Sequence, residues 1–356
     1  MKKTTEFLSF FLSCSLLLGS CQTSSYKTSI FYYDLSDTFL LELRDTLNNR
    51  FDQDDISYEI FGAERNQMEQ NRQVVDAIQN GSQLLILNLV DRLSAPAIME
   101  KAEQTKTPVI FFNREPFPDD MKAALKEFDD FYYVGTNASY EGTVQADMAA
   151  ALLGSPDNIS PAFDKNQDGK IQIVLLKGEL GHQDTEYRSE KCLSHLKELG
   201  YDVDLLSTRY GNWSRSSAKQ EMQEVLEEEG DSIELVFCNN DDMALGVIDA
   251  LEEGNRIQDG KMPFPIFGVD GTKVGLEAIE KGTMAGTVRN HAKNQAYAIA
   301  TLAEKILHHE PIDLSSFGFD YNDYHCVYPA GEPIVSKNIQ FIGTDPDSSD
   351  DSTSQS

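Results

Sequence analysis

Short runs of apolar residues alternate along this chain with longer stretches in which apolar residues recur every three or four positions. The short runs favour buried strands, at residues 30–33, 58–61, 84–88, 108–112, 132–134, 171–176, 203–206, 234–238, 265–269 and 284–288. The longer stretches predict helices, among them residues 65–80, 184–199, 216–228, 241–253 and 291–308. Such alternation is typical of parallel sheets covered by helices on both faces. We therefore predict an α/β fold with two doubly wound, Rossmann-like domains, each with a parallel sheet of about five strands.

Length and composition agree with two folded domains. A chain of 356 residues, 40% of them apolar, can build two cores of ordinary size. The formal net charge is −29 at pH 7, and an acidic surface of this kind repels nucleic acid, which we exclude as a partner. The Ser- and Asp-rich end, residues 345–356, is predicted to be a disordered acidic tail.

The amino-terminal segment has the composition of an export signal. A pair of lysines precedes the apolar residues 7–18, a stretch too short to cross a membrane as a permanent helix. The sequence Leu-Gly-Ser-Cys that ends at Cys21 resembles a bacterial lipobox. Residues 1–20 are therefore predicted to be a lipoprotein signal peptide, Cys21 the lipidated residue and residues 21–27 a tether; an ordinary signal peptide with a chance cysteine is the alternative. The lipid would hold the protein outside the cytoplasmic membrane, its only contact with the bilayer.

Polar and aromatic side chains follow many of the predicted strands. In doubly wound sheets, ligands bind beyond the carboxyl ends of the strands, so these side chains are expected to line one crevice. Carboxylates and amides suit the hydroxyl groups of a sugar, and flat rings suit its apolar faces. The residues are Asp37, Phe39, Asn113, His182, Asp184, Arg188, Trp213, Asn240, Asp270 and Asn290.

One loop, residues 164–172, carries oxygen-bearing side chains at alternate positions. They are Asp164, Asn166 and Asp168, and Gly169 allows a sharp turn. Hard cations such as Ca²⁺ are bound by six to eight oxygens arranged in this way. The position of the bidentate glutamate of an EF-hand is Leu175 here, inside a predicted strand. Either the loop binds no metal, or a carboxylate from elsewhere in the chain completes the site.

Several segments, taken together in order and spacing, resemble the bacterial galactose/glucose-binding proteins of the periplasmic sugar-binding protein family. The likeness runs from Ile30 to His291 and is densest at residues 108–116, 132–136, 164–188, 234–241, 267–270 and 285–290. The resemblance implies that Phe39 and Trp213 enclose a hexose, D-galactose or D-glucose, from its two faces. The other eight crevice residues would then form hydrogen bonds with the sugar. Because the turn before Asp37 is longer than in the family, Asp34 is an alternative to Asp37.

The same resemblance implies a structural Ca²⁺ in the loop. Its ligands would be the side chains of Asp164, Asn166, Asp168 and Gln172, the main-chain carbonyl of Lys170, and the remote side chain of Glu234. Glu234 precedes a predicted strand, which would have to lie beside the strand at residues 171–176. The ion would stabilise one domain, away from the sugar.

The family fold is the type I periplasmic binding protein fold, in which three chain segments form a hinge. It implies an amino-terminal sugar-binding domain of residues 28–136 plus 291–327 and a second sugar- and calcium-binding domain of residues 137–290 plus 328–344. The protein is expected to act as a monomer that captures the sugar by hinge closure and delivers it to the permease of an ABC importer. The alternative is that it presents the sugar to a chemoreceptor or sensor kinase.

Several of these residues also allow a different interpretation. Asp184 and Asp270 could form the carboxylate pair of a glycosidase, but Arg188 is expected to keep Asp184 ionised, and no P-loop or nucleophile–base arrangement is visible. We therefore predict that the protein is not an enzyme. Trp213 could instead pack on the helix that follows it, and His182 could be a surface residue. Asn240 and Asp241 could cap a helix; Asp241 is expected to cap it while Asn240 faces the crevice.

Overall fold

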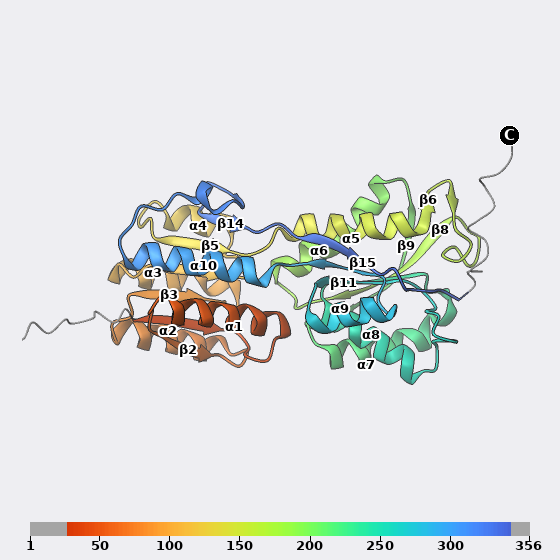
Figure 1. Cartoon of the computed structure of the whole chain (residues 1–356), viewed down its shortest axis with the longest axis horizontal. Coiled ribbons are helices and arrows are strands. Elements are labelled where there is room, and N and C mark those ends of the chain that lie inside the picture. The colour runs from red at the N-terminus through yellow and green to blue at the C-terminus, as the bar shows by residue number, and fades with distance from the viewer. Residues whose placement is uncertain (1–26, 343–356) are drawn as a thin grey trace, which may run out of the picture.

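The computed structural model describes residues 27–342, which form two lobes (Figure 1). The amino-terminal lobe has a seven-stranded sheet in the order β13-β14-β5-β4-β3-β1-β2. Its strands are β1 (Thr28–Tyr32), β2 (Tyr58–Gly62), β3 (Leu84–Leu87), β4 (Val109–Phe112), β5 (Phe131–Val134), β13 (Asp320–Tyr321) and β14 (Cys326–Tyr328). All neighbours pair in parallel except β13 and β14. The central strands are buried over their whole length, as strands covered on both faces must be.

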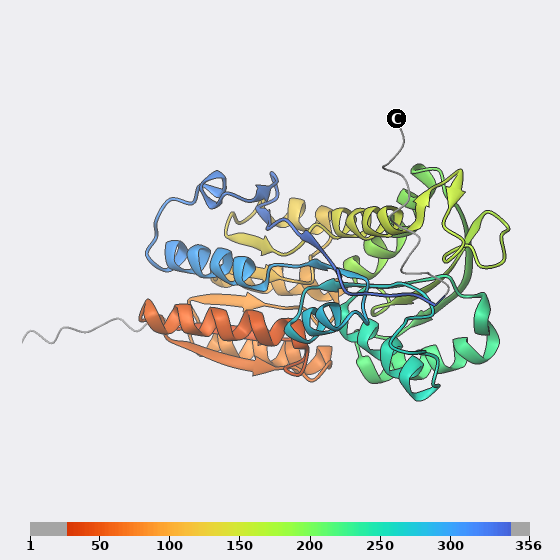
Figure 2. The same cartoon turned by 45° about the vertical axis from the view of Figure 1, so that its right-hand side comes forward.

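Helices cover both faces of this sheet. Figures 1 and 2 show α1 (Thr38–Gln53) and α10 (Ala292–Leu307) side by side, and their apolar faces share one core with the sheet. On the other face lie α2 (Gln67–Gln79), α3 (Ala95–Thr105) and the short α4 (Pro118–Ala124). Two 3₁₀ turns, η1 (Arg92–Ser94) and η3 (Leu314–Phe317), lie in the connections.

The second lobe has a six-stranded sheet in the order β15-β12-β11-β10-β8-β9. Its strands are β8 (Lys170–Lys177), β9 (Asp202–Tyr210), β10 (Leu235–Cys238), β11 (Ile266–Asp270), β12 (Gly286–Arg289) and β15 (Glu332–Val335). The helices α5 (Ala138–Leu153) and α6 (Gln183–Glu198) pack together, as do α7 (Arg215–Glu228), α8 (Asp241–Glu253) and α9 (Lys273–Lys281) (Figure 1). A small hairpin, β6 (Gly154–Ser155) with β7 (Asn158–Ile159), and the 3₁₀ turn η2 (Gly230–Ser232) complete the lobe.

The chain passes between the two sheets three times, at residues 135–137, 290–291 and 329–331. The first passage joins β5 to α5, the second joins β12 to α10, and the third joins β14 to β15. The exact limits of the predicted domains stay a prediction. Predicted segments outside residues 27–342, namely the signal peptide, Cys21, most of the tether and the acidic tail, lie outside the described residues.

The predicted strands are present, and the expected count of about five per sheet is too low. The additional strands β13, β14 and β15 come from residues 320–335. Strands β13 and β15 are mostly exposed and lie at the sheet edges, whereas β14 is buried but only three residues long, too short to stand out as an apolar run. Strand β15 runs antiparallel to β12. Strand β9 is longer than the predicted residues 203–206 because it is an edge strand that pairs only with β8 and stays half exposed. Within the described residues, no helix has the length and apolarity needed to span a membrane.

Candidate ligand-binding site

A cavity lies between the lobes, where the carboxyl ends of both sheets meet. It contains all ten residues that the sequence predicts for the crevice, together with two others. The lining residues are Tyr33, Asp37, Phe39, Asn113, Arg114, His182, Asp184, Arg188, Trp213, Asn240, Asp270 and Asn290. The structure therefore brings the predicted side chains together from strand ends far apart in the chain. Their role as ligand contacts stays a prediction. We call this space the ligand cavity.

The first helix sets the position of Asp37. Asp37 is the N-cap of α1, where its Oδ1 accepts a hydrogen bond from the Leu40 amide at 2.9 Å. Its Oδ2 accepts one from the Tyr33 hydroxyl at 2.8 Å. The alternative, Asp34, forms a 2.6 Å ion pair with Arg65 and does not line the cavity. Asp37 is therefore the carboxylate that reaches the ligand cavity.

Asn113 and Arg114 follow β4 at the sheet edge. Asn113 has a φ of 59°, a left-handed conformation that Asn tolerates better than most residues. Its carbonyl accepts hydrogen bonds from the Tyr133 hydroxyl at 2.9 Å and from Gln183 Nε2 of the other lobe at 2.6 Å. The Arg114 guanidinium lies 3.9 Å from the centre of the Tyr33 ring. This turn therefore forms one wall of the cavity and a contact between the lobes.

His182 begins α6 from the second lobe. Its Nδ1 accepts a hydrogen bond from the Asp184 amide at 3.1 Å, as an N-cap does. Burial lowers the pKa of His182 well below its ordinary value of 6.5, so the ring is neutral near pH 7. Because Nδ1 accepts, the hydrogen of the neutral ring is on Nε2. His182 thus offers a hydrogen-bond donor rather than a positive charge.

Arg188 and Asp184 form a buried ion pair one turn apart on α6. Arg188 Nη2 lies 3.2 Å from Asp184 Oδ2, while Asp184 Oδ1 is buried and has no hydrogen-bond partner in the described part of the chain. The expectation that Arg188 keeps Asp184 ionised is wrong. Burial raises the pKa of Asp184 to about 7, and the opposing effect of Arg188 is smaller. An unpartnered buried carboxylate oxygen is rare in proteins, and this one belongs to a residue that lines the cavity.

Trp213 lies flat on the end of β8. It adopts a φ of 62° in the turn before α7, and a Cβ atom at Gly178 would lie only 2.1 Å from its ring. The His182 ring packs against it edge-on, with the centroids 5.0 Å apart. The indole Nε1 is buried and has no partner within the described part of the chain. Trp213 is therefore placed by Gly178 and His182 as a wall of the cavity.

The helix cap at Asn240 differs from expectation. Asn240, not Asp241, is the N-cap of α8, and its Oδ1 accepts a 3.0 Å hydrogen bond from the Met243 amide. Asp241 is fully buried and accepts hydrogen bonds from Thr272 and Thr287. The error arose because two adjacent polar residues can both cap a helix, and only the three-dimensional contacts decide which one does.

Asp270 and Asn290 end adjacent strands β11 and β12. Asp270 has a φ of 116°, and burial raises the pKa of its carboxyl well above the ordinary value. The Asn290 amide donates to the Asp270 carbonyl at 3.0 Å, and Gln295 Nε2 donates to Asn290 Oδ1 at 2.6 Å. These bonds hold both side chains at the second chain passage.

Two charged contacts close the lobes over the cavity. Glu179 of the second lobe pairs with Arg114 at 2.5 Å and with Arg65 at 3.0 Å, and we call these three residues the interlobe clasp. The Thr38 hydroxyl also donates to Asp242 across the gap at 2.6 Å. The cavity volume is about 30 Å³, room for about two water molecules. The lobes are therefore closed tightly around the cavity.

The oxygen-rich loop at residues 164–172 is stabilised by its own backbone. The Asp164 carboxylate accepts from the amides of Asp168 at 3.0 Å and Gly169 at 3.1 Å, and Asp168 accepts from the Lys170 amide at 2.9 Å. Within residues 27–342, no group of three or more His, Cys, Asp or Glu side chains is arranged to hold a metal. The side chains of Asn166 and Gln172 offer further oxygens that could bind a metal. Gln172 is buried, and its Oε1 has no hydrogen-bond partner among the described residues. We call residues 164–172 the cation loop.

Glu234 lies beside this loop as predicted. Strand β10 pairs in parallel with β8, with Leu235 opposite Ile173, so the predicted pairing of these strands is confirmed. Glu234 is buried, and its carboxylate accepts from the amides of Lys165 at 2.5 Å and Gln172 at 3.1 Å. The all-oxygen donor set, with an unpartnered Gln172 oxygen, fits a hard cation.

Comparison with known proteins shows the family to which this chain belongs. Residues 29–311 match the model of the periplasmic binding protein domain. The chain belongs to the periplasmic binding protein family. It is 33% identical over 311 residues to the D-galactose/methyl-galactoside binding periplasmic protein of Haemophilus influenzae, covering 86% of this chain and 89% of that one. It is 22% identical to the ribose import binding protein of Escherichia coli, covering 79% and 86%.

Solved structures of periplasmic binding proteins share the fold. An ABC transporter solute binding protein from Bacillus halodurans with bound myo-inositol has a TM-score of 0.72 and 23% identity, covering 88% of this chain and 96% of that one. A periplasmic solute binding protein from Actinobacillus succinogenes with bound D-allose has a TM-score of 0.72 and 20% identity, covering 87% and 98%. The predicted α/β fold with two sheet-based lobes is confirmed.

Sequence reasoning missed several residues at this site. Tyr33 and Arg114 line the cavity. Both directly follow or end a predicted strand, the same signal that identified Asn113, so position alone could have found them. Glu179 of the interlobe clasp carries no such signal, since its contacts depend on how the lobes close.

Proposed function

We propose that this protein binds a hexose, D-galactose or D-glucose, in the ligand cavity and delivers it to an ABC importer. The observation that carries the proposal is the convergence of hydrogen-bonding and aromatic side chains from both lobes on one buried cavity. Phe39 comes from the amino-terminal lobe and Trp213 from the second lobe. Two rings from opposite sides suit the two apolar faces of a pyranose.

The polar groups match the hydroxyls of a sugar in number and type. Asp37, Asp184 and Asp270 supply acceptors, and Arg188 and the Nε2–H of His182 supply donors. The side-chain amides of Asn113, Asn240 and Asn290 offer both. Because the Oδ1 of Asp184 has no partner among residues 27–342, a ligand hydroxyl at that point would gain a hydrogen bond without displacing one.

Hinge closure follows from the way the site is divided between the lobes. A sugar reaches its full set of contacts only when the lobes are together, so it favours the closed form over the open one. Opening would break the ion pairs between Glu179 and the two arginines. The closed outer surface would then be presented to the permease.

Family membership supports binding rather than turnover. The relatives of this chain are named as binding proteins for galactosides and ribose. In the cavity, the carboxylates of Asp184 and Asp270 face Arg188 and Asn290 rather than a nucleophile. We propose a non-enzymatic role for this site.

Calorimetry of the purified protein tests the proposal. The panel contains D-galactose, D-glucose, methyl β-D-galactoside, D-ribose, D-allose and myo-inositol. Saturable binding of D-galactose or D-glucose, tighter than binding of the other compounds, is expected. If only the pentose or the cyclitol binds, the hexose proposal is wrong; if nothing binds at millimolar concentration, the sugar-binding proposal fails. Incubation with the ligand followed by product analysis tests the absence of turnover.

We further propose that the cation loop binds a structural Ca²⁺. Asp164, Asn166, Asp168, Gln172 and Glu234 would hold it with side-chain oxygens, and Lys170 with its carbonyl. Bound to the folded lobe alone, the ion would raise its stability. EDTA is expected to lower the melting temperature, and added Ca²⁺ to restore it, with sugar preference unchanged. If neither melting nor bound metal changes, the loop holds no ion.

The lipid anchor at Cys21 is also a proposal. A chain anchored in this way would be retained at the outer face of the membrane, close to the permease. Cell fractionation of the wild type and of Cys21→Ala is the test. Release of the variant from the membrane is expected, and equal membrane retention of both chains would contradict the anchor.

A further inference from the structure

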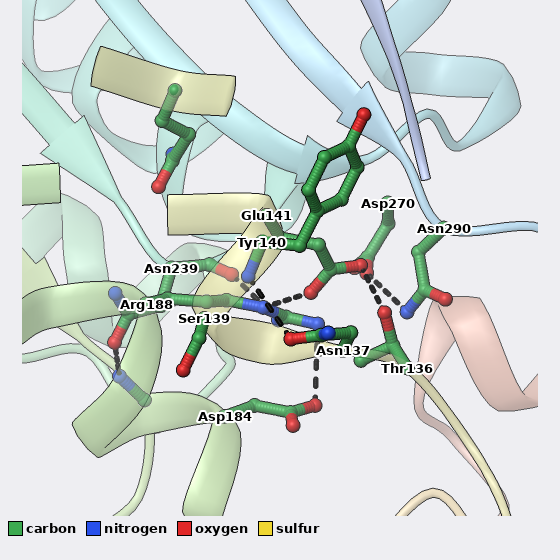
Figure 3. A network of polar contacts seen from close by, with 12 residues as sticks. Thr136, Asn137, Ser139, Tyr140, Glu141, Asp184, Arg188, Asn239, Asp270 and Asn290 are labelled. Atoms are coloured by element: carbon green, nitrogen blue, oxygen red, sulfur yellow. Dashed lines mark hydrogen bonds and ion pairs between the residues drawn. The ribbon is translucent and has the colours of Figure 1, made fainter. Parts of the chain in front are cut away.

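Glu141 is a fully buried acid that lies outside the lining of the ligand cavity. It lies in the first turn of α5, after the N-cap Asn137, immediately beyond the first chain passage. A buried carboxylate is costly unless charged or hydrogen-bonding partners compensate it. Its Oε1 accepts from the Thr136 hydroxyl at 2.6 Å and its Oε2 from Arg188 Nε at 2.7 Å (Figure 3).

The guanidinium of Arg188 has three fixed partners. Nε donates to Glu141 at 2.7 Å, Nη1 to the Asn239 carbonyl at 2.9 Å and Nη2 to Asp184 at 3.2 Å. The bond to Glu141 is the shortest of the three. Because Arg188 lines the cavity and Glu141 does not, Glu141 acts on the cavity only through Arg188. Glu141 and Asn239 together hold the guanidinium plane against Asp184.

Glu141 also contacts the chain passages between the lobes. Thr136, its hydroxyl donor, lies in the first passage, at residues 135–137. A Cβ atom at Gly331, in the third passage, would lie 3.6 Å from Glu141 Cγ. One side chain therefore contacts the first passage and lies beside the third. Figure 3 shows Glu141 between Thr136 and Arg188, with Asp270 at the end of β11 and Asn290 of the second passage nearby.

We propose that Glu141 is a positioning residue of the binding site, which orients Arg188 toward the ligand and links that orientation to the chain passage at Thr136. This inference rests on the proposed sugar-binding function. When the passage at Thr136 bends, the Thr136–Glu141–Arg188 bonds transmit the movement to the guanidinium. The arginine is then correctly oriented only in one of the two lobe arrangements.

The charges around Asp184 provide a readout that a merely structural role would not alter. Arg188 of the same helix and Glu141 of α5 face it, and Arg92 of η1, Glu115 after β4 and Tyr133 of β5 also act on it. Glu141 and Glu115 raise the pKa of Asp184, while Arg188 and Arg92 lower it. Removing the charge of Glu141 with its shape kept would leave Arg188 to pair with Asp184 alone, and Asp184 would titrate at lower pH.

The test uses the fluorescence of Trp213, the single tryptophan of the chain. Arg188 lies 6.0 Å from its ring, so the indole reports on the charges of this group. Full-length wild type, Glu141→Gln, Thr136→Val and the matched control Asp147→Asn are titrated from pH 5 to 9 without sugar, and then with D-galactose and D-glucose at pH 8. Asp147 is an exposed acid on the same helix, paired with His195 at 2.9 Å.

Without sugar, the fluorescence midpoint of Glu141→Gln is expected at lower pH than those of wild type and Asp147→Asn. With sugar, Glu141→Gln is expected to bind about tenfold more weakly, and Thr136→Val to change in the same direction by less. A Glu141→Gln midpoint and affinity equal to wild type would overturn the role of Glu141 while sugar binding stands.

If no hexose binds the wild type, the proposed function fails, and the titration without sugar still decides whether Glu141 controls the charge at Asp184. Circular dichroism shows whether each variant folds. If Glu141→Gln does not fold, Thr136→Val decides: a shifted midpoint supports the link through Thr136, and an unchanged one overturns it.

Discussion

The ligand cavity and the cation loop both gather acidic and amide side chains, yet they are organised in opposite ways. In the cation loop, Asp164 and Asp168 accept hydrogen bonds from amides of the same loop and lie toward solvent. In the ligand cavity, Asp184 is 2% exposed and keeps one oxygen without a partner. Local contacts satisfy the two acids of the first region. The second is satisfied only when something else occupies it.

The two sites also differ in how many lobes contribute residues to them. The cation loop and Glu234 belong to one lobe, on adjacent strands β8 and β10. The ligand cavity takes walls from both lobes and from a chain passage. A ligand in the loop would therefore stabilise one lobe, whereas a ligand in the cavity would also change how the two lobes are placed.

Removing one acid from each region tests most directly whether the two regions act independently. Asp184→Asn is expected to weaken sugar binding by about 10- to 100-fold, because it replaces one carboxylate oxygen of a buried site with an amide group that cannot accept a hydrogen bond. Its response to EDTA should stay that of wild type. Asp168→Asn should do the reverse, and the two are compared by calorimetry and thermal melting. Equal losses of sugar affinity in both variants would mean that the two regions are not independent.

The aromatic wall should have the next largest effect. Trp213→Ala removes the ring that rests on Gly178 and is expected to cost at least about 1 kcal/mol of sugar-binding free energy. Tyr297→Ala, which removes an exposed aromatic ring of α10, serves as the control. Calorimetry at constant pH measures both. Unchanged affinity in Trp213→Ala would make the ring a packing residue only.

A rise in pH should change the stability of the protein and its affinity for sugar in opposite directions. The pKa of Asp184 is raised to about 7 from an ordinary 3.8, so the folded protein binds a proton that the unfolded chain releases. Stability without sugar is therefore expected to fall as pH rises between about 4 and 7, while sugar affinity rises as the carboxylate ionises. Melting and calorimetry at pH 5.5 and 8 check both signs, with Asp184→Asn as the control. Parallel trends in the two measurements would argue against Asp184 as an ionised ligand contact.

The interlobe clasp should give the smallest effect. Glu179 is partly exposed, so its pairs with Arg65 and Arg114 are screened by water, and each is worth no more than about 1 kcal/mol. Glu179→Gln is expected to enlarge the radius of gyration without sugar, measured by small-angle X-ray scattering. Glu186→Gln, which breaks a pair with Lys177 inside one lobe, should not. A radius unchanged by Glu179→Gln would show that the clasp does not keep the lobes together.

Sequence patterns predicted the fold and most of the cavity because both depend on strand ends. Asn113, Trp213 and Asp270 follow apolar runs that form strands in the structure, and parallel strands place their carboxyl ends at one edge. The choice of Asp37 over Asp34 could not be made from sequence, because it depends on which acid caps α1.

The errors share a physical origin. Asn240 rather than Asp241 caps α8, and burial outweighs Arg188 in setting the pKa of Asp184. Backbone geometry decides the first case and desolvation the second, and neither can be seen from the sequence. The edge strands β13 and β15 were missed because exposed edge strands need no apolar run, and β14 because a three-residue strand gives too short a signal.

The three passages of the chain between the lobes also determine when each lobe can form during synthesis and export. The amino-terminal lobe needs α10 to cover the face shared with α1, and it needs β14 beside β5. These elements follow the whole of the second lobe except its edge strand β15. The first lobe therefore remains incomplete until almost the entire chain is available, so its contacts of longest sequence separation form last.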